Sequence, residues 1–385
     1  MDAYAVRSSS RSFEPRLRHD RSDRVERATA RRMLASIRSS SPHQKRDWGL
    51  CPHCIASEER RKDFLMKAAV IQALGQPPRF EDFPEPTAGE GEVGVNVRAA
   101  GLHPVVRAQA SGSQSGSPNV FPQIPGIDGV GSLDDGTRVY FDKARPPYGT
   151  MAERCVVLRE RIFPIPDRLD DLTAAALFNP GLTSWLAFTR AQLTKGETVL
   201  IVGATGAAGK LAVQIAKRLG AGKVIVLGRN AQVLNELPPL GADVTISLNQ
   251  PDQQLIEAIA SAASPGGIHV ILDYLWGRPT EAVIAAIARL DVTQGAPSVR
   301  LIDLGQIAGP TITLPAFVLR SSGLLISGIA VALTTIERLR EAIPQLIAEA
   351  ASGTLRIETE PVPLAQIEAA WQQQTPDNRR LVVLP

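Results

Sequence analysis

The stretch that decides the fold is Thr198-Val-Leu-Ile-Val-Gly-Ala-Thr-Gly-Ala-Ala-Gly209. Its first part, 199–202, is a short run of apolar, mostly β-branched residues that is typical of a buried strand. After the glycines, residues 211–219 carry apolar side chains spaced four apart, and Gly220 follows as a helix C-cap residue would. Strand, glycine turn and helix in this order are the context that a dinucleotide-binding loop requires.

Each glycine of this loop has an expected purpose. Gly203 opens the turn, Gly206 lets the backbone approach a pyrophosphate, and Gly209 lets the helix pack closely on the strand. The helix N-terminus would then offer N–H groups and its positive dipole end to the phosphates. The spacing departs from the strict G-x-G-x-x-G pattern because Ala204 stands in place of its first glycine. Such a loop alone also fits an ordinary turn of an α/β protein, so the surrounding chain must decide.

Downstream of the loop, apolar strands alternate with helical segments. We expect strands at 224–227, 244–247, 270–273, 299–304 and 324–329, with helical segments near 231–238, 252–263 and 279–290. This alternation predicts a doubly wound parallel sheet, and it favours a nucleotide-binding purpose for the loop.

Upstream of the loop, short strands separated by Gly and Pro turns predict a small, mostly β domain that begins at Met66. A helix at 170–178 is expected, capped by Asp170 or Asp171 and broken at 179–183, with a second helix at 184–192. The tail is expected to return to the first domain, with helices near 335–351 and 364–374 and a strand at 381–384.

The length of 385 residues predicts two domains with extra segments, and 44% hydrophobic with 21% charged residues is the composition of a globular protein. No apolar run is long enough to span a bilayer, so no membrane association is expected. Three cysteines cannot build a disulfide framework, which favours a reducing, cytoplasmic location.

The N-terminal segment, residues 1–65, is expected to be a disordered basic extension. It carries 15 Lys and Arg against 9 Asp and Glu, whereas the rest of the chain has 27 against 30, so no nucleic-acid surface is expected on the folded part. The segment is a targeting sequence, a mis-assigned start or a genuine arm. Its Cys51-Pro-His-Cys54 pair has no second pair to complete a zinc site and reads as incidental.

Residues 66–385 resemble medium-chain dehydrogenases/reductases of the zinc-independent NADPH:quinone oxidoreductase branch. The resemblance rests on Met66-Lys-Ala-Ala-Val-Ile, Ala99-Ala-Gly-Leu-His-Pro, Pro125-Gly-Ile-Asp-Gly-Val-Gly, Gly149-Thr-Met-Ala-Glu, Leu182-Thr-Ser-Trp, Gly203-Ala-Thr-Gly-Ala-Ala-Gly, Leu240-Gly-Ala-Asp and Asp273-Tyr, in this order. It implies a GroES-like domain at 66–180, completed by 320–385, and a Rossmann domain at 181–319. It also implies an active site between them, NADPH-dependent reduction and a homodimer.

No metal is expected. Zinc alcohol dehydrogenases of this superfamily carry a Cys in the loop occupied here by 101–103 and a His-Glu pair where this chain has Ile127-Asp128. Only His103 remains as a ligand, and one ligand does not hold zinc.

NADPH, rather than NADH, is the expected cofactor. The strand after the glycine loop ends in Gly228-Arg229-Asn230, so a guanidinium suited to a 2′-phosphate stands where an NAD enzyme places a carboxylate. A solvated surface arginine is the alternative. With the resemblance, the expected cofactor-binding residues are Thr183, Gly203, Ala204, Thr205, Gly206, Ala207, Ala208, Gly209, Gly228, Arg229, Asn230, Tyr274, Leu304 and Arg379. Arg380 is a further candidate phosphate contact, and Asn179 is a weaker neighbour of Thr183.

The catalytic side chains are less well defined. Family members often carry Asn, Asp and Tyr where this chain has His103, Val106 and Ala108. His103 is therefore the expected hydrogen-bond donor or general acid, with a histidine bonded inside the wall of the site as the alternative. Arg107 is a candidate anion contact, and the resemblance places Tyr148 near the site. His269 and Cys155 are expected to be structural.

These residues predict a metal-independent oxidoreductase that transfers a hydride from NADPH to a quinone or an α,β-unsaturated carbonyl. The apolar residues at 106 and 108 favour a hydrophobic acceptor. Two alternatives stay open. One is an enoyl-thioester reductase, and the other is a non-catalytic NADPH-binding sensor that uses the basic arm.

Overall fold

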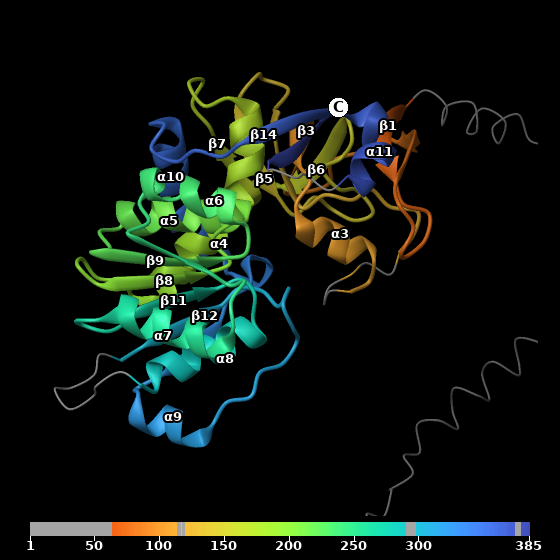
Figure 1. Cartoon of the computed structure of the whole chain (residues 1–385). Coiled ribbons are helices and arrows are strands. Elements are labelled where there is room, and N and C mark those ends of the chain that lie inside the picture. The colour runs from red at the N-terminus through yellow and green to blue at the C-terminus, as the bar shows by residue number, and fades with distance from the viewer. Residues whose placement is uncertain (1–63, 114–116, 118–119, 290–297, 374–378) are drawn as a thin grey trace, which may run out of the picture. The chain divides into compact units, whose positions relative to one another are not determined.

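The structure is a computed structural model that describes residues 64–113, 117, 120–289, 298–373 and 379–385 (Figure 1). The extension expected at 1–65, including the pair Cys51 and Cys54, lies outside these residues except for Phe64 and Leu65. Within the described ranges, no helix is long and apolar enough to cross a membrane.

The mostly antiparallel part begins with a two-stranded hairpin of β1 (Leu65–Val70) and β2 (Arg79–Pro84). A seven-stranded sheet follows in the order β14-β15-β3-β4-β5-β7, with β6 paired to β3. Its strands are β3 (Glu92–Gly101), β4 (Asp128–Ser132), β5 (Arg138–Asp142), β6 (Arg154–Leu158), β7 (Ile162–Pro164), β14 (Thr359–Pro363) and β15 (Arg380–Leu384). The helix α3 (Pro104–Ala110) follows β3 directly.

The second sheet has six parallel strands in the order β10-β9-β8-β11-β12-β13, which confirms the doubly wound sheet predicted from the sequence. The strands are β8 (Thr198–Val202), β9 (Lys223–Gly228), β10 (Val244–Ser247), β11 (Val270–Asp273), β12 (Arg300–Asp303) and β13 (Leu325–Gly328). The helices that follow β8 are α5 (Ala207–Arg218), α6 (Ala231–Glu236), α7 (Asp252–Ala263), α8 (Arg278–Ile287), α9 (Ala316–Ser321), α10 (Ile336–Ala351) and α11 (Ile367–Gln372).

Both faces of the parallel sheet are buried, which explains its continuous apolar strands. Alternate residues of β8 show the division: Val199 and Ile201 pack in the cluster that contains α4 and α5, while Leu200 and Val202 pack in the cluster that contains α7 and α8. Figure 1 shows α5 and α7 on opposite faces of this sheet. The carboxyl ends of the strands are therefore the edge at which the loops can meet a ligand.

A single helix, α4 (Asp171–Ala191), replaces the two helices that were predicted, so the expected break at 179–183 is wrong. Asp170 caps α4 as expected, because its side chain accepts a hydrogen bond of 2.8 Å from the N–H of Thr173. Pro180 lies inside the helix and removes one backbone hydrogen bond, at a cost of about 3 kcal/mol. Burial offsets this cost, because each large apolar side chain taken out of water contributes about 1.5–3 kcal/mol.

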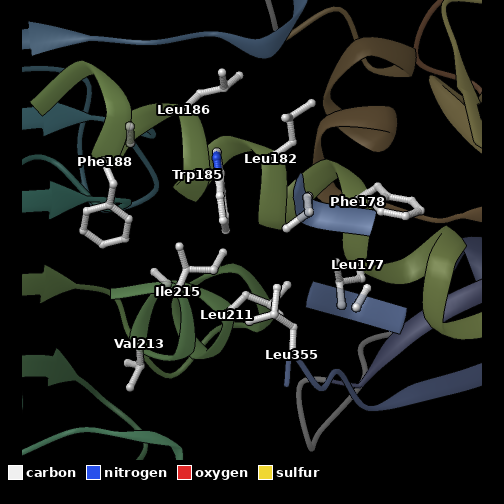
Figure 2. Close-up of a cluster of buried hydrophobic side chains, with 14 of the residues drawn as sticks. Leu177, Phe178, Leu182, Trp185, Leu186, Phe188, Leu211, Val213, Ile215 and Leu355 are labelled. Atoms are coloured by element: carbon white, nitrogen blue, oxygen red, sulfur yellow. The ribbon is translucent and has the colours of Figure 1, made fainter. Parts of the chain in front are cut away.

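The packing around α4 supplies that burial. Figure 2 shows Trp185 pointing from α4 toward Leu211 and Ile215 of α5. The same cluster includes Val130 and Tyr140 from the antiparallel sheet. Because α4 packs against both sheets, it is the element that joins the two halves of residues 64–385.

The tail is divided between the two sheets. β13 extends the parallel sheet, whereas β15 pairs with β3 in the antiparallel sheet, with Val382 opposite Gly101. The expected boundary at 320 assigned both strands to the first domain, so the strand pairing corrects it for β13. The register shows that β13 belongs to the parallel sheet, because Leu325 pairs with Arg300 of β12, which in turn pairs with Val270 of β11.

Candidate functional site

The glycine loop after β8 has the tight geometry that its sequence predicts. Gly203 has a φ of +93°, a conformation that L side chains rarely adopt. A Cβ on Gly209 would lie 2.5 Å from the Cα of Ala204, so only a glycine lets α5 begin this close to the strand. The expectation for Gly209 as the close-packing position is confirmed.

Gly206 differs from the other two glycines, because the protein itself does not require it. It is the N-cap of α5 with a φ of −82°, and the atom nearest to a Cβ at this position, the Gly203 oxygen, would lie 3.8 Å away. The first bonded N–H of the helix is that of Lys210, which donates to the Gly206 oxygen. The N–H groups of Ala207 and Ala208 precede it and so have no acceptor within the helix. The loop thus leaves space and backbone donors where an anion would sit.

The end of β9 closes beside this loop. A Cβ on Gly228 would lie 2.3 Å from the Thr205 side chain, so the glycine allows strand and loop to meet. Arg229 is exposed, and its carbonyl oxygen accepts a hydrogen bond from the Asn249 amide at 2.8 Å. Asn230 caps α6, since its side chain accepts from the Val233 N–H at 3.2 Å. Asn230 therefore holds the local chain, and Arg229 is the charged group that faces solvent.

Tyr274 and Leu304 lie at the carboxyl ends of β11 and β12. Tyr274 is half-buried next to the loop, and its Cβ atom lies 3.3 Å from the point that a Cβ on Gly203 would occupy. Its hydroxyl meets the Ser184 hydroxyl of α4 at 2.7 Å, and burial raises the pKa of the phenol above its usual range. The N–H of Leu304 donates to the Asp273 oxygen at 2.7 Å. Thr183, one residue before Ser184, is partly exposed and donates its hydroxyl to the Asn179 oxygen.

His103 lies at the other end of α4, in the antiparallel half. It is only 1% exposed, and its Nε2 atom is 3.1 Å from the Asp128 Oδ1 atom. The approach is not along a hydrogen-bonding direction, so neither ring nitrogen has a hydrogen-bond partner among the described residues. Burial lowers the pKa of His103, and the neighbouring Asp128 opposes that shift only in part. The ring is therefore neutral, and its burial does not favour direct contact with a substrate.

Asp128 is the centre of a buried polar group that sequence reasoning did not assemble. Tyr140 donates its hydroxyl to the Asp128 Oδ2 atom at 3.2 Å. The positive charge of Arg380 faces the same carboxylate, while burial lowers the pKa of this arginine to about 10, so it stays charged at neutral pH. Arg380, expected as a phosphate contact, thus belongs to the His103 group.

Two further candidates lie close to this group. Arg107 donates to the carbonyl oxygens of Ala370 and Gln373, at 3.0 and 3.1 Å, and so caps the end of α11. Tyr148 is half-buried and packs edge-on against Phe83, with ring centroids 5.7 Å apart. Arg379 is exposed at the entry to β15. Within the described part of the chain, no group of three or more His, Cys, Asp or Glu side chains is arranged to hold a metal ion.

The chain is similar to known reductases over nearly all of the described length. A family profile for zinc-binding dehydrogenases matches residues 207–290. A probable NADPH-dependent quinone reductase of Emericella nidulans is 25% identical over 83% of this chain and 100% of its own. The quinone oxidoreductase of Thermus thermophilus, solved also in complex with NADPH, is 30% identical, with a TM-score of 0.70 over 83% of this chain and 100% of its own.

Another solved structure, a putative NADPH:quinone reductase of Bacillus thuringiensis, shares the fold at 21% identity, with a TM-score of 0.73 over 84% of this chain and 99% of its own. The chain belongs to the medium-chain dehydrogenase/reductase superfamily, among its quinone oxidoreductases. The GroES-like and Rossmann architecture that the sequence predicted is confirmed.

Sequence reasoning missed Ser184 and Asp128 as site residues. Ser184 was expected only as the first residue of a second helix, and its bond to Tyr274 spans 90 positions. Asp128 was noticed only as the residue that stands in place of a metal ligand. The only signal would have been the relative placement of charged and polar residues on different strands of one sheet. A single sequence does not reveal that placement.

Proposed function

We propose that this protein is an NADPH-dependent reductase that transfers a hydride to a quinone or an α,β-unsaturated carbonyl. The observation that carries this proposal is the glycine loop, which leaves open space at Gly206 and packs at Thr205 against Gly228, the residue before the exposed Arg229. The names of the relatives from Emericella nidulans and Thermus thermophilus support the same reaction.

The residues around the loop fit this cofactor. The N–H groups of Ala207 and Ala208 would bind the pyrophosphate, and the absence of acidic residues from the first turn of α5 suits an anion. Arg229 would pair with the 2′-phosphate. At the other end, Thr183, Tyr274 and Leu304 would position the nicotinamide, while Asn230 orders the strand end that carries Arg229. Arg379 is proposed as a secondary contact to the cofactor.

Bound NADPH supplies a hydride, so the net reaction with a quinone consumes one NADPH and one proton and yields NADP⁺ and the hydroquinone. The protein orients the two reactants and excludes water. Val106 is buried in the same cluster as Leu102 and does not meet the acceptor itself. The partly exposed Val105 and Ala108 of α3, beside Tyr148, would form an apolar wall for the acceptor. This wall favours a hydrophobic quinone or enone over a small alcohol.

We infer that the reaction needs no metal. The position where a zinc enzyme would place its ligands contains His103 and Asp128, but a catalytic zinc site needs three protein ligands. The charge of Arg380 already faces Asp128 and would repel a divalent cation. These residues do not fit zinc, and no step is assigned to it.

The proposed roles of His103, Arg107 and Tyr148 follow from their burial. His103 acts through α3 and Asp128 as a positioning residue, since its ring is buried. Arg107 fixes α3 to the end of α11. Tyr148 is half-buried, and its hydroxyl can meet an acceptor.

A panel of acceptors tests the proposal, with NADPH oxidation as the readout. We expect turnover with benzoquinones, naphthoquinones and enals, and little with crotonyl-CoA. Preferential reduction of crotonyl-CoA would establish the enoyl-thioester reductase instead. NADPH binding without turnover of any acceptor would favour the sensor, and deletion of residues 1–63 would then weaken binding to an acidic partner.

We also propose a homodimer that forms along β13. This strand is at the end of the parallel sheet and pairs only with β12 among the described strands, so one of its edges is open. Half of the ten exposed large hydrophobic residues in the described ranges fall between 307 and 333, and Leu325 on β13 is 60% exposed. An open strand edge beside exposed apolar side chains favours pairing with a second copy.

A reducing, cytoplasmic environment is proposed from cysteine usage. The chain has three cysteines, and Cys155 is a buried free thiol on β6. Burial raises the pKa of this thiol above its usual range, so it packs as a small apolar side chain and not as a nucleophile.

A further inference from the structure

The exposure pattern of α4 singles out two residues. From Ala174 to Phe188 every residue of this helix is buried except Asn179 and Thr183, which are partly exposed. Residues four apart lie on one face of a helix. The middle of α4 therefore presents a single polar stripe, while all its other faces belong to the core.

This stripe lies between the two parts of the site. Near its start, the Ala175 oxygen and the His103 Nε2 atom both lie within 2.6 Å of the point that a Gly101 Cβ would occupy. Near its end, Ser184 bonds to Tyr274, which packs beside Gly203. With a rise of about 1.5 Å per residue, Asn179 is about 6 Å along the helix from Ala175 and about 7.5 Å from Ser184.

Asn179 carries the polar group of the stripe that is not already used. The hydroxyls of Thr183 and Ser184 donate to the carbonyl oxygens of Asn179 and Pro180. The amide of the Asn179 side chain forms no hydrogen bond with any residue that the structure describes. On α3, the partly exposed Ala108 offers no side-chain donor, and Val106 is buried in the core.

We propose that the side-chain amide of Asn179 binds the acceptor oxygen, a role that rests on the proposed reductase function. When the hydride reaches the acceptor, the electron pair of its C=O bond moves to this oxygen. The Asn179 Nδ2–H donates a hydrogen bond to the developing anion, and the proton that completes the product comes from water, because an amide does not release one at neutral pH. Asn179 thereby supplies a polar contact that the apolar residues at 106 and 108 cannot.

The expected effect is confined to the acceptor. Removal of one donor to an oxyanion lowers kcat about 10²–10³-fold in a closed site. Asn179 is partly exposed, so water replaces some of the lost bond, and we expect kcat/KM for the quinone to fall roughly 10- to 100-fold. The affinity for NADPH should stay unchanged, since its proposed contacts are with other residues.

The test compares Asn179→Ala and Asn179→Asp with the wild type. Asn179→Asp keeps the shape but replaces the donor with a negative charge, so it should lose at least as much as Asn179→Ala. Thr189→Val is the control. Thr189 donates its hydroxyl to the Trp185 carbonyl oxygen of α4, as Thr183 does to the Asn179 carbonyl oxygen, but it lies away from the stripe. Two measurements are made on each protein: kcat/KM for 1,4-naphthoquinone, and binding of that quinone to the NADP⁺-saturated protein by quenching of tryptophan fluorescence.

Loss of quinone turnover and quinone binding in both Asn179 variants, with unchanged NADPH affinity and an unchanged Thr189→Val, supports the inference. Unchanged quinone parameters overturn it, as does a fall in NADPH affinity alone, which would assign Asn179 to the cofactor. If the wild-type protein fails to oxidise NADPH with every acceptor tested, the proposed function fails. In that case quinone binding still decides, because equal binding by the wild type and Asn179→Ala overturns the inference. Far-ultraviolet circular dichroism verifies that each variant is folded.

Discussion

The hydroxyl oxygens of Ser184 on α4 and Tyr274 beyond β11 lie 2.7 Å apart. Ser184 has one proton to give, and its Oγ atom also lies 3.1 Å from the Pro180 oxygen. Both bonds form together only if Ser184 donates to Pro180 and accepts from Tyr274. The serine therefore ties the proline turn of α4 to the end of the parallel strand that faces the glycine loop.

Removing the Tyr274 hydroxyl and removing the Ser184 hydroxyl should lower the free energy of unfolding by different amounts. Tyr274→Phe deletes the donor and leaves the Ser184–Pro180 bond intact, so we expect a loss of about 1 kcal/mol in the free energy of unfolding. Ser184→Ala leaves the inward-facing phenol without a partner and should cost more, about 1–3 kcal/mol. Urea unfolding of both variants and the double variant measures the coupling. A smaller loss for Ser184→Ala than for Tyr274→Phe would contradict this direction of donation.

Gly206 and Gly209 should separate cofactor binding from stability. Gly209→Ala places a methyl group 2.5 Å from the backbone of Ala204, and overpacking of this kind costs about 1–3 kcal/mol. Gly206→Ala meets no protein atom within 3.8 Å, so stability should not change, but the methyl group occupies the proposed pyrophosphate space. Its Kd for NADPH should rise roughly tenfold, or about 1.4 kcal/mol. Thermal unfolding and fluorescence titration make the comparison, and a stable Gly206→Ala with wild-type affinity would argue against this cofactor site.

The buried His103 should make the protein less stable in acid. Its pKa is lowered from 6.5 by burial, so below pH 6.5 the unfolded chain binds a proton that the folded chain does not. The contribution of the neutral His103 to the free energy of unfolding is therefore fully present above pH 6.5. It is lost as the pH falls toward the pKa of the folded state, with a slope of up to about 1.4 kcal/mol per pH unit.

The comparison of wild type with His103→Gln isolates this effect. The surrounding ionisable groups, which are Asp128, Tyr140 and Arg380, remain in both proteins. Urea midpoints between pH 5 and pH 8 should converge in acid, because the variant lacks the histidine slope. Parallel profiles would show that His103 is protonated equally in the folded and unfolded states.

The dimer proposal predicts that one charge on the open strand is enough to separate the copies. Leu325→Lys places a cation on β13 within the exposed apolar surface, where pairing would bury it. We expect light scattering after size exclusion to report a dimer for the wild type and a monomer for the variant. Leu158→Lys, at an exposed leucine of β6 on the other sheet, is the control and should remain dimeric. A monomeric wild type at micromolar concentration would contradict the proposal.

Local patterns were sufficient to predict the parallel sheet and the glycine turn. The apolar run of β8 and the close packing at Gly209 depend on neighbours within a dozen residues, so the sequence order reveals them. The same local rules failed at Pro180, because the burial of α4 between two sheets outweighs the missing backbone bond. That burial comes from residues far along the chain, such as Val130 and Leu355.

The site was harder to predict than the fold for a related reason. His103, Asp128 and Arg380 come from the start of α3, from β4 and from β15. They meet only because β4 and β15 both pair with β3, the strand that leads into α3. His103 therefore looked like an available acid, whereas its neighbours and its burial make it a neutral core residue. The polar stripe on α4 was hidden because Asn179 was expected in a break between helices.

The most direct test of the central claim, hydride transfer from NADPH to a quinone, is a steady-state comparison of NADPH and NADH with a naphthoquinone. The account predicts quinone-dependent oxidation that favours NADPH in the wild type. In Arg229→Ala, kcat/KM for NADPH should fall roughly tenfold or more, the value of a lost charge-assisted contact, while that for NADH is unchanged. Arg168→Ala, at another exposed arginine, should behave as the wild type. An absence of quinone-dependent oxidation, or equal losses with both nucleotides in Arg229→Ala, would contradict the account.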